Sequence, residues 1–452
     1  MDTVADTQVQ TEKRRTLPKP RISLAFAPAL GKRNLLIAVA LFVAGVLSLW
    51  IFQKAFHLSH LGVSSTPYFV YQAQSFLHGH WDLPLSPKRT DIVLIHGKSY
   101  IVYPPMPAVV LMPFVAIWGL KTSDILLTVI CSALNLSLLF LVLEQARENG
   151  FTRRVWMENV CICVLLWYGS ISLWLSLGGR MWFTAHIVCM TFTLLALLAA
   201  LRRHYALASL LLGCAFFARA TVIFGYLFLF YLAWQDAHPE PHIERFLASL
   251  WRRKPAWTTI PWRRLLPAFV VLAGVLAIFM WRNTMLFGSP LDSGYNVLIA
   301  QHYSEVTTGP FNISYVPANI VANFFSFPQT LFSGPFDRHP VLNVMNSGTA
   351  VSVFVTTPLF LFLFWRNRTF SATRTVLWIT LGLMVIAILL FHASGWFQFG
   401  ARYLFDAYPF AFLLLALTDA RVDWRFAALG YFGVLINILG AYQFWTTITP
   451  HL

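Results

Sequence analysis

The sequence is poor in charged residues, and above all in acids. Of its 452 residues only 11% are Asp, Glu, Lys or Arg, and 18 acids stand against 33 Lys and Arg. An ordinary soluble domain contains roughly 25% charged residues, so this composition argues against that class. Apolar runs of about twenty residues recur along the whole chain, and this is the length a helix needs to cross a bilayer. The chain is therefore predicted to be an all-α polytopic membrane protein.

The sequence also lacks a disulfide framework and any zinc-binding spacing. Its five cysteines all lie inside apolar runs, where cysteine acts as a small buried hydrophobic residue. No internal repeat of the transporter type and no appended soluble domain are visible. We expect one transmembrane domain over residues 34–452, preceded by a basic tail over residues 1–33 that lies in the cytoplasm.

The formal net charge of +15 does not indicate a nucleic-acid partner. The basic residues cluster in short segments between apolar runs, which is how the positive-inside rule orients a membrane protein. The tail contains several of them before the first apolar run, and no small-residue cleavage site follows that run. The first span is therefore predicted to be a retained anchor with a cytoplasmic N-terminus.

Hydropathy predicts eleven spans with an external C-terminus. Nine are continuous apolar runs, at residues 34–52, 124–143, 155–175, 183–201, 265–284, 350–365, 376–391, 403–417 and 426–445. The region 206–234 is too long for one span and short for two, and it is predicted to be two short helices that meet at Arg219. The segment 104–120 has four prolines, which break helices, and is assigned to the outer interface. This choice places most Lys and Arg on the cytoplasmic side.

With this topology, the residues 56–123 and 287–348 form two large external loops, joined on that face by 176–182 and 392–402. The stretch 56–113 looks non-helical and is rich in proline, aromatics and histidine. Irregular backbone cannot face lipid, so the stretch must lie outside the hydrocarbon or line a cavity. It is the first place where we expect chemistry.

Several segments of the chain match one known family in order and kind. The first external loop ends in Tyr103-Pro-Pro-Met-Pro107, and the segment from Tyr68 to Gly79 looks like a helix lying along the membrane. Late in the chain, Gly400-Ala-Arg-Tyr-Leu-Phe-Asp-Ala-Tyr-Pro409 looks like a G-x-R-Y-x-x-x-x-x-P signature. The segment from Leu286 to Tyr295 looks like a second recurrent sequence segment. Together these features resemble the GT-C superfamily of integral-membrane glycosyltransferases, which includes relatives of protein O-mannosyltransferase and lipid A aminoarabinose transferase, and uncharacterised bacterial members.

The resemblance implies transfer of a sugar from a polyprenyl-phosphate donor to a lipid, glycan or protein acceptor at the external membrane face, with inversion. GT-C members usually place an acid soon after the first span. Residues 53–81 contain neither Asp nor Glu, so that acid does not carry over to this chain.

A base for the acceptor hydroxyl is therefore sought further along the loop. Asp91 is favoured because an apolar and aromatic run follows it, and Asp82 is the second choice. Each has an ordinary reading as a turn residue. His186, at the external start of a span, is an alternative base, or else a histidine of the core or headgroup level.

The donor phosphate needs a cation at the external interface. The candidates are Arg402, Lys98 and Arg180, and Arg402 has a second reading as a residue that snorkels to the headgroups. Arg219 lies within apolar sequence, where a charge faces a cavity or a partner, so it binds phosphate or forms a structural ion pair. Asp406 is placed to pair with Arg402 at i,i+4.

Aromatic residues complete the predicted site. Tyr103 is a candidate for stacking on sugar or isoprenoid, together with Tyr100 and Trp396. No metal-binding residues are predicted. The loop histidines have no ligand spacing, although a divalent cation such as Mg²⁺ or Mn²⁺, which prefers oxygen ligands, is a possible cofactor.

Two functions from different classes remain open at this point. The first is the glycosyltransferase. The second is a transporter or flippase of lipid-linked glycans, or a degenerate family member that binds them without reacting. Either would be surrounded by membrane lipids, and the compact loops favour a bacterial plasma membrane over the endoplasmic reticulum.

Overall fold

The computed structural model describes residues 31–84, 91–237, 261–327, 332–333, 341–342, 350–367, 371–395 and 398–448. Most of the basic tail (residues 1–30) and Trp396 lie outside this part of the chain. The figures follow the same residues.

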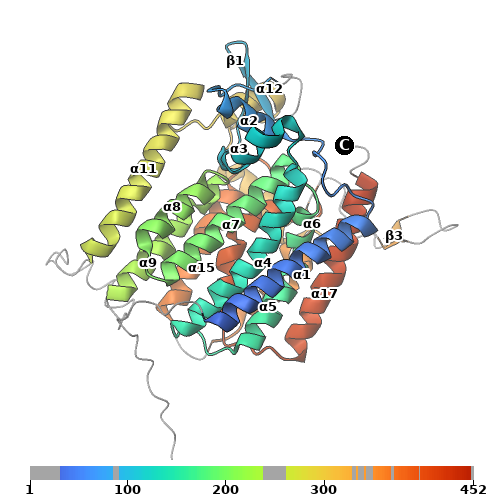
Figure 1. Cartoon of the computed structure of the whole chain (residues 1–452), viewed down its shortest axis with the longest axis vertical. Helices are drawn as coiled ribbons and strands as arrows, with labels where there is room; N and C mark the ends of the chain where they lie inside the picture. The colour runs from blue at the N-terminus through green and yellow to red at the C-terminus, as the bar shows by residue number, and fades with distance from the viewer. Residues whose placement is uncertain are drawn as a thin grey trace, which may run out of the picture.

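Long helices form the body of the molecule (Figure 1). The long members are α1 (Lys32–Ala55), α4 (Asp124–Glu148), α7 (Met181–Leu201), α11 (Trp262–Phe287), α15 (Ala372–Leu389) and α17 (Trp424–Gln443). By length and composition, six helices in the described ranges could cross a membrane, and they match six of the predicted spans. The helical membrane class is confirmed at this level, whereas the total of eleven spans stays a prediction.

The remaining predicted spans are built from shorter elements. They are α5 (Trp156–Tyr168), α6 (Ser172–Ser176), α8 (Tyr205–Phe216), η2 (Ala220–Phe224), α9 (Gly225–Ala237), α14 (Val353–Thr356), η6 (Pro358–Phe364), η7 (Arg402–Ala407) and α16 (Tyr408–Ala416). The two short helices predicted to meet near Arg219 are confirmed. The predicted helices over 350–365 and 403–417 are interrupted instead. In each, a proline that has no backbone N–H to donate stands at the first turn of the second element.

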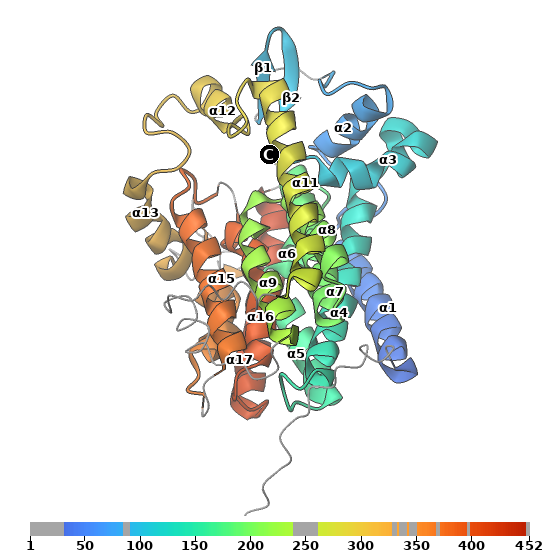
Figure 2. The same cartoon turned by 90° about the vertical axis from the view of Figure 1, so that its left-hand side faces the viewer.

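The rest of the described chain gathers mainly at one end of the bundle. Its elements are α2 (Tyr68–Leu77), β1 (Ile92–Ile95), β2 (Lys98–Ile101), α3 (Met106–Trp118), η1 (Gly119–Lys121), α12 (Tyr295–His302), η4 (Ile313–Tyr315), α13 (Val316–Ile320), η5 (Val321–Phe325), β3 (Phe332–Ser333), β4 (Val341–Leu342) and η8 (Phe444–Ile448). Figures 1 and 2 show β1, α2, α3 and α12 together at that end, above the long helices. The helix predicted from Tyr68 is confirmed as α2.

The predicted first external loop is more regular than its sequence suggested. It looked non-helical, but it contains the helices α2 and α3 and an antiparallel hairpin in which Ile95 is opposite Lys98. The hairpin turn is His96-Gly97, with φ of 48° and 75°. Two residues with positive φ are what a two-residue turn of type I′ requires. The apolar run Ile92–Ile95 followed by the His96-Gly97 pair was the missed signal.

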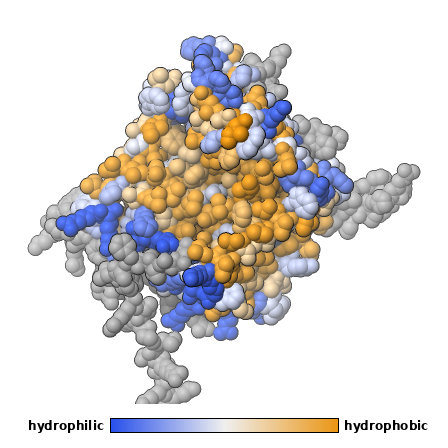
Figure 3. Space-filling model, in the orientation of Figure 1, coloured by the Kyte–Doolittle hydropathy of each residue, from blue (hydrophilic) through white to orange (hydrophobic). Residues whose placement is uncertain are grey.

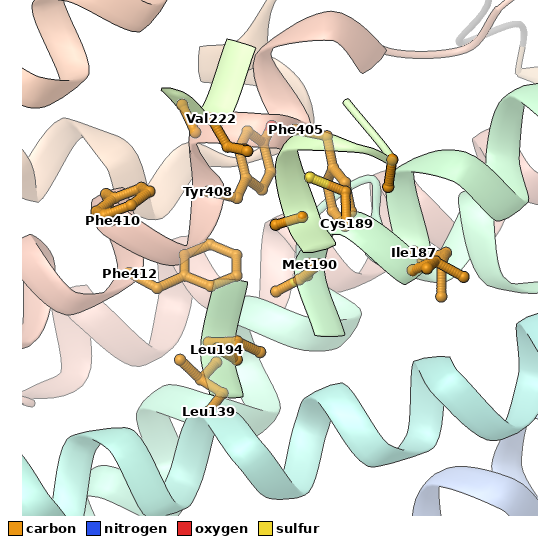
Figure 4. Close-up of a cluster of buried hydrophobic side chains, with 14 of the residues drawn as sticks. Leu139, Ile187, Cys189, Met190, Leu194, Val222, Phe405, Tyr408, Phe410 and Phe412 are labelled. Carbon is orange, nitrogen blue, oxygen red and sulfur yellow. The ribbon is translucent and has the colours of Figure 1, made fainter. Parts of the chain in front are cut away.

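The surface and the core follow the hydropathy of the sequence. In Figure 3 a hydrophobic region covers the middle of the visible face, and hydrophilic residues gather towards both ends. In the interior, buried side chains from five elements pack against one another (Figure 4). These elements are α4, α7, η2, η7 and α16. The side chains labelled there are Leu139, Ile187, Cys189, Met190, Leu194, Val222, Phe405, Tyr408, Phe410 and Phe412. This core supports the segments that hold the candidate site.

Candidate functional site

Asp91 is the acid that the first external loop buries. It directly precedes β1, and its φ of 68° lies in the left-handed region, where Asp and Asn are tolerated better than other non-glycine residues. Its side chain is held by two donors. The Tyr103 hydroxyl donates to Oδ1 at 3.2 Å, and Nε1 of Trp182, on the first turn of α7, donates to Oδ2 at 3.1 Å. The carboxylate is thus fixed where the hairpin meets the helix bundle.

Burial dominates the electrostatics of this carboxylate. Desolvation raises the pKa of Asp91 above its usual value, although the hydrogen bonds from Tyr103 and Trp182 and the charge of Arg402 oppose the shift. Burial, with the nearby Asp91 charge, also raises the pKa of Tyr103 well above that of a free tyrosine. At neutral pH Tyr103 is therefore a hydrogen-bond donor. Asp91 is a better proton acceptor than an exposed aspartate, because its basicity is higher.

Arg402 lies beside Asp91 at the start of η7. Its guanidinium is over the ring of Tyr403 at 5.4 Å and over that of Trp182 at 6.0 Å. Trp182 therefore contacts both Asp91 and Arg402. The Arg402 side chain is buried, and its Nε has no hydrogen-bond partner. It forms no ion pair with any acid in the described ranges. A buried guanidinium with unused donors is suited to an anionic ligand.

The sequence signature around Arg402 has a structural reason. Gly400 lies so close to Ile171 that a Cβ would be 2.3 Å from its Cγ2 atom. Pro409 occupies the first turn of α16, where its missing N–H costs nothing. The glycine and the proline therefore fix the short η7 segment that presents Arg402 and Tyr403.

Asp406 is the centre of a second buried network. His186 on α7 donates from Nδ1 to Oδ1 at 2.7 Å, and Arg219 forms an ion pair with Oδ2 at 3.1 Å. Thr221 also donates to Oδ2, at 2.5 Å. The predicted pair between Arg402 and Asp406 is wrong. Residues 402–407 form a 3-10 helix with a different side-chain period, and the carboxylate turns towards Arg219 and His186.

The two networks meet through Tyr403. The guanidinium of Arg219 lies 5.3 Å from the centroid of its ring, and that of Arg402 lies 5.4 Å away. The structure therefore brings together Asp91, Tyr103, Arg402, Arg219 and His186 among the residues predicted for the site.

Helix α12, from the second external loop, holds the hairpin from outside. The side-chain amide of Gln301 accepts from the Leu94 N–H at 2.9 Å and donates to the Leu94 carbonyl at 2.8 Å. His302 bonds the carbonyl of Ile92 through Nε2 at 2.8 Å. The segment from Leu286 to Tyr295 is the turn into α12, with Gly288 and Gly294 at φ of 78° and 92°.

Three other predicted residues have different partners. Asp82 and Lys98 form an ion pair at 3.4 Å, with 32% and 57% of their side chains exposed, on the outer part of the loop. Arg180 is buried with its guanidinium over the ring of Trp445 at 5.8 Å, on the side of α17. Burial lowers the pKa of Arg180.

The acids of the centre are already engaged by protein donors. Both oxygens of Asp91 and both of Asp406 accept hydrogen bonds. In the part of the chain that the structure describes, no three His, Cys, Asp or Glu side chains form a metal-ligand group. These residues do not fit a divalent cation as arranged, and the possible Mg²⁺ or Mn²⁺ cofactor stays a prediction that chelation would test.

No family model and no curated protein sequence matches the chain. Two of the similar solved structures come from different organisms. ArnT from Cupriavidus metallidurans bound to undecaprenyl phosphate has a TM-score of 0.45 and 14% identity, over 87% of this chain and 62% of that chain. The Archaeoglobus fulgidus oligosaccharyltransferase in the apo form has a TM-score of 0.43 and 13% identity, over 90% of this chain and 56% of that chain. This chain thus spans less than two thirds of either.

Both are GT-C glycosyltransferases. The chemistry below is argued from the residues of this chain.

Sequence reasoning missed four residues of this centre. Trp182 was read only as part of a loop, and Thr221 and Gln301 were not considered. Asp406 was assigned the wrong partner. Each acts across a large separation in sequence, 91 residues for Trp182 and Asp91 and 220 for His186 and Asp406, so no local pattern reveals it.

Proposed function

We propose that the chain is a membrane glycosyltransferase that uses a polyprenyl-phosphate sugar donor at the external face. The observation that supports this most is that two buried groups of suitable chemistry lie close together. Asp91 is a carboxylate of raised basicity, and Arg402 beside it has unused donors and no acid partner in the described ranges. A transferase of this kind needs both a proton acceptor and a phosphate-binding cation.

In the proposed reaction Asp91 removes the proton from an acceptor hydroxyl. The acceptor oxygen forms a bond to the anomeric carbon of the sugar as the bond from that carbon to the phosphate oxygen breaks. The electron pair leaves with the phosphate, whose added charge Arg402 neutralises. A single displacement inverts the anomeric centre. The acceptor class, whether lipid, glycan or protein, is left open by these residues.

The rest of the centre positions these two residues. Tyr103 and Trp182 orient the Asp91 carboxylate, and Tyr403 separates Arg402 from Arg219. Asp406 neutralises Arg219, which leaves Arg402 as the cation available to a phosphate.

The test is transfer from a panel of radiolabelled polyprenyl-phosphate sugars in membranes that contain the wild type, Asp91→Asn or Asp82→Asn. Asparagine tolerates the left-handed backbone at position 91, so this change removes the base and keeps the turn. Loss of a general base costs about 10²- to 10⁴-fold in rate. Asp82→Asn is the matched control, because it removes an acid of the same loop that lies outside the centre.

We expect Asp91→Asn to lose transfer while it still binds donor, and Asp82→Asn to retain transfer. Equal transfer by the wild type and Asp91→Asn would reject Asp91 as the base. Donor binding by the wild type, without transfer and without release of free polyprenyl phosphate, would instead support a transporter, a flippase or a degenerate binding protein.

A further inference from the structure

Four arginines surround a cavity at the end of the bundle opposite Asp91. It has a volume of about 350 Å³ and lies where the start of α1, the end of α4 and the start of α5 meet. Its lining includes Arg33, Arg147, Thr152, Arg153, Arg154 and Trp156. Figure 2 shows this junction at the far end of the helices from β1 and α12. The 25 residues of α4 span about 37 Å at 1.5 Å per residue, which is close to the thickness of a bilayer.

Three acids lie nearby, and two of them interact with Arg147 of the cavity as well as with other groups. Glu144 accepts from Asn159 at 2.7 Å and forms an ion pair with Arg147 at 2.8 Å. Glu148 accepts from Asn34 at 3.0 Å and forms a longer ion pair with Arg147 at 3.8 Å. Glu158 accepts from the backbone N–H of Val155 at 2.8 Å, at the start of α5. No acid is among the residues that line the cavity.

The arginines keep a surplus of positive charge. Arg147 is neutralised by Glu144, and Arg33 lies 4.0 Å from the same carboxylate, at the limit of an ion pair. Arg154 donates to the carbonyls of Ala416, Thr418 and Ala420, which are neutral acceptors. Arg153 is exposed and forms no ion pair with a described acid. The cavity therefore attracts an anion.

Two contacts hold the arginines in place before any ligand binds. The three carbonyl bonds of Arg154 tie the α4–α5 connection to the end of α16. The guanidinium of Arg33 lies 5.6 Å from the ring centroid of Trp156, a cation–π contact between α1 and α5. A pre-formed group of guanidinium donors suits the oxygens of a phosphate.

Apolar surface adjoins the cavity. Leu36 on α1 is 71% exposed, and Val155 and Met157 at the start of α5 are 56% and 61% exposed. In a membrane these side chains would face acyl chains, while the arginines stand at headgroup level. Basic pockets between helices on the cytoplasmic side bind anionic headgroups in this way.

We propose that this cavity, defined by Arg33, Arg147, Arg153 and Arg154, binds the phosphate of an anionic phospholipid headgroup on the cytoplasmic side. The site is distinct from the candidate transfer centre and contains none of its residues. Its role is to fix the junction of α1, α4 and α5 to the lipid of the inner leaflet.

The experiment is native mass spectrometry of the full chain in detergent, titrated with phosphatidylglycerol or with phosphatidylcholine. The test variant is Arg33→Gln/Arg153→Gln, which leaves the carbonyl bonds of Arg154 and the Glu144–Arg147 pair intact. We expect its affinity for phosphatidylglycerol to fall by about tenfold or more, from the loss of two charges near the surface. The weaker binding of phosphatidylcholine should not change.

Arg263→Gln/Arg264→Gln is the matched control. It removes the same charge from the start of α11, which contributes no residue to the cavity. Its affinity for phosphatidylglycerol should equal that of the wild type, and an equal loss in both variants would overturn the proposal. If the double variant does not fold, Arg153→Gln alone changes one exposed side chain and gives the same comparison.

Inorganic phosphate distinguishes the two sources of the ligand. Added in large excess over lipid, it should leave phosphatidylglycerol bound, because the adjoining apolar surface contributes to lipid binding and not to phosphate binding. Displacement of the lipid by inorganic phosphate would overturn the lipid assignment and identify a site for free phosphate.

Discussion

Asp91 shows how one residue combines conformational and chemical requirements. Its backbone is in the left-handed region at φ 68°, its side chain is 7% exposed, and its two oxygens have different donors. Aspartate and asparagine tolerate that backbone, but only aspartate can act as a base there. The turn at this position and the proposed catalytic role of Asp91 are therefore compatible.

The pH dependence of transfer should report the Asp91 carboxyl. Burial raises its pKa, so the ionised form that accepts a proton is lost as the pH falls through a value above the roughly 3.9 of a free aspartate. We expect kcat/KM to be constant at neutral pH and to fall tenfold per pH unit below that raised pKa. The profile of Asp82→Asn should match the wild type.

The same profile separates Asp91 from the alternative base. If His186 accepts the proton, the acid limb should disappear in His186→Gln and persist in a residual activity of Asp91→Asn. If Asp91 accepts it, His186→Gln should keep the limb even where its rate is lower.

The ion pair of Asp406 with Arg219 should matter to stability. Asp406→Asn leaves the Arg219 guanidinium buried without its counter-charge, and breaking a buried pair in this way costs about 3–5 kcal/mol. We expect a marked fall in the unfolding temperature in detergent. The double variant Asp406→Asn/Arg219→Gln should be less destabilised than the sum of the two single changes. A melting temperature of Asp406→Asn equal to that of the wild type would contradict the structural role.

At the scale of elements, the site depends on how the two external loops join. The hairpin β1–β2 offers one free edge, and α12 satisfies part of it through the amide of Gln301 and the ring of His302. Because Asp91 directly precedes β1, this contact between two distant loops restrains the proposed base.

Gln301→Ala should therefore loosen the hairpin without unfolding the bundle. Both bonds to Leu94 are exposed, so water replaces them, and the loss of stability should stay near or below about 1 kcal/mol per bond. We expect faster amide hydrogen exchange over Ile92–Ile95 together with slower transfer. Asn296→Ala on the same helix removes a bond to Asp292 and is the control. Unchanged exchange in Gln301→Ala would show that α12 does not hold the hairpin.

At the scale of the whole molecule, two polar ends are separated by the apolar middle of the bundle (Figure 3). The candidate transfer centre lies at the end formed by β1, α3 and α12, and the arginine cavity lies at the other end. The predicted topology places the first outside and the second in the cytoplasm.

Labelling with a membrane-impermeant maleimide in intact cells tests this orientation. Lys98→Cys on the hairpin should react directly, whereas Arg425→Cys should react only after the membrane is permeabilised. The unaltered chain measures the background from its own cysteines, of which Cys161 and Cys214 are half-buried. The reverse pattern would invert the topology and would move the proposed transfer to the cytoplasmic face.

Much of the architecture could be predicted from local sequence. Apolar runs predicted the six long helices, and the charge within 206–234 predicted the break near Arg219. The hairpin was missed because its strands are only four residues long and the second contains a single β-branched residue, although the His96-Gly97 turn was a readable signal. The 3-10 segment at η7 was missed because hydropathy does not distinguish it from an α-helix.

By itself the sequence determined that the chain is a helical membrane protein, because hydropathy is a local property. It also contains so few acids and arginines that the candidates for the site could be named from it. Only the tertiary structure decided that Asp91 lies with Arg402 while Asp82 pairs with Lys98, and that Asp406 binds Arg219 and His186. The physical reason is that these partners come from different helices and loops. Which of these residues form pairs depends on which buried charges can be neutralised at the least cost in desolvation. This is decided only when the helices pack.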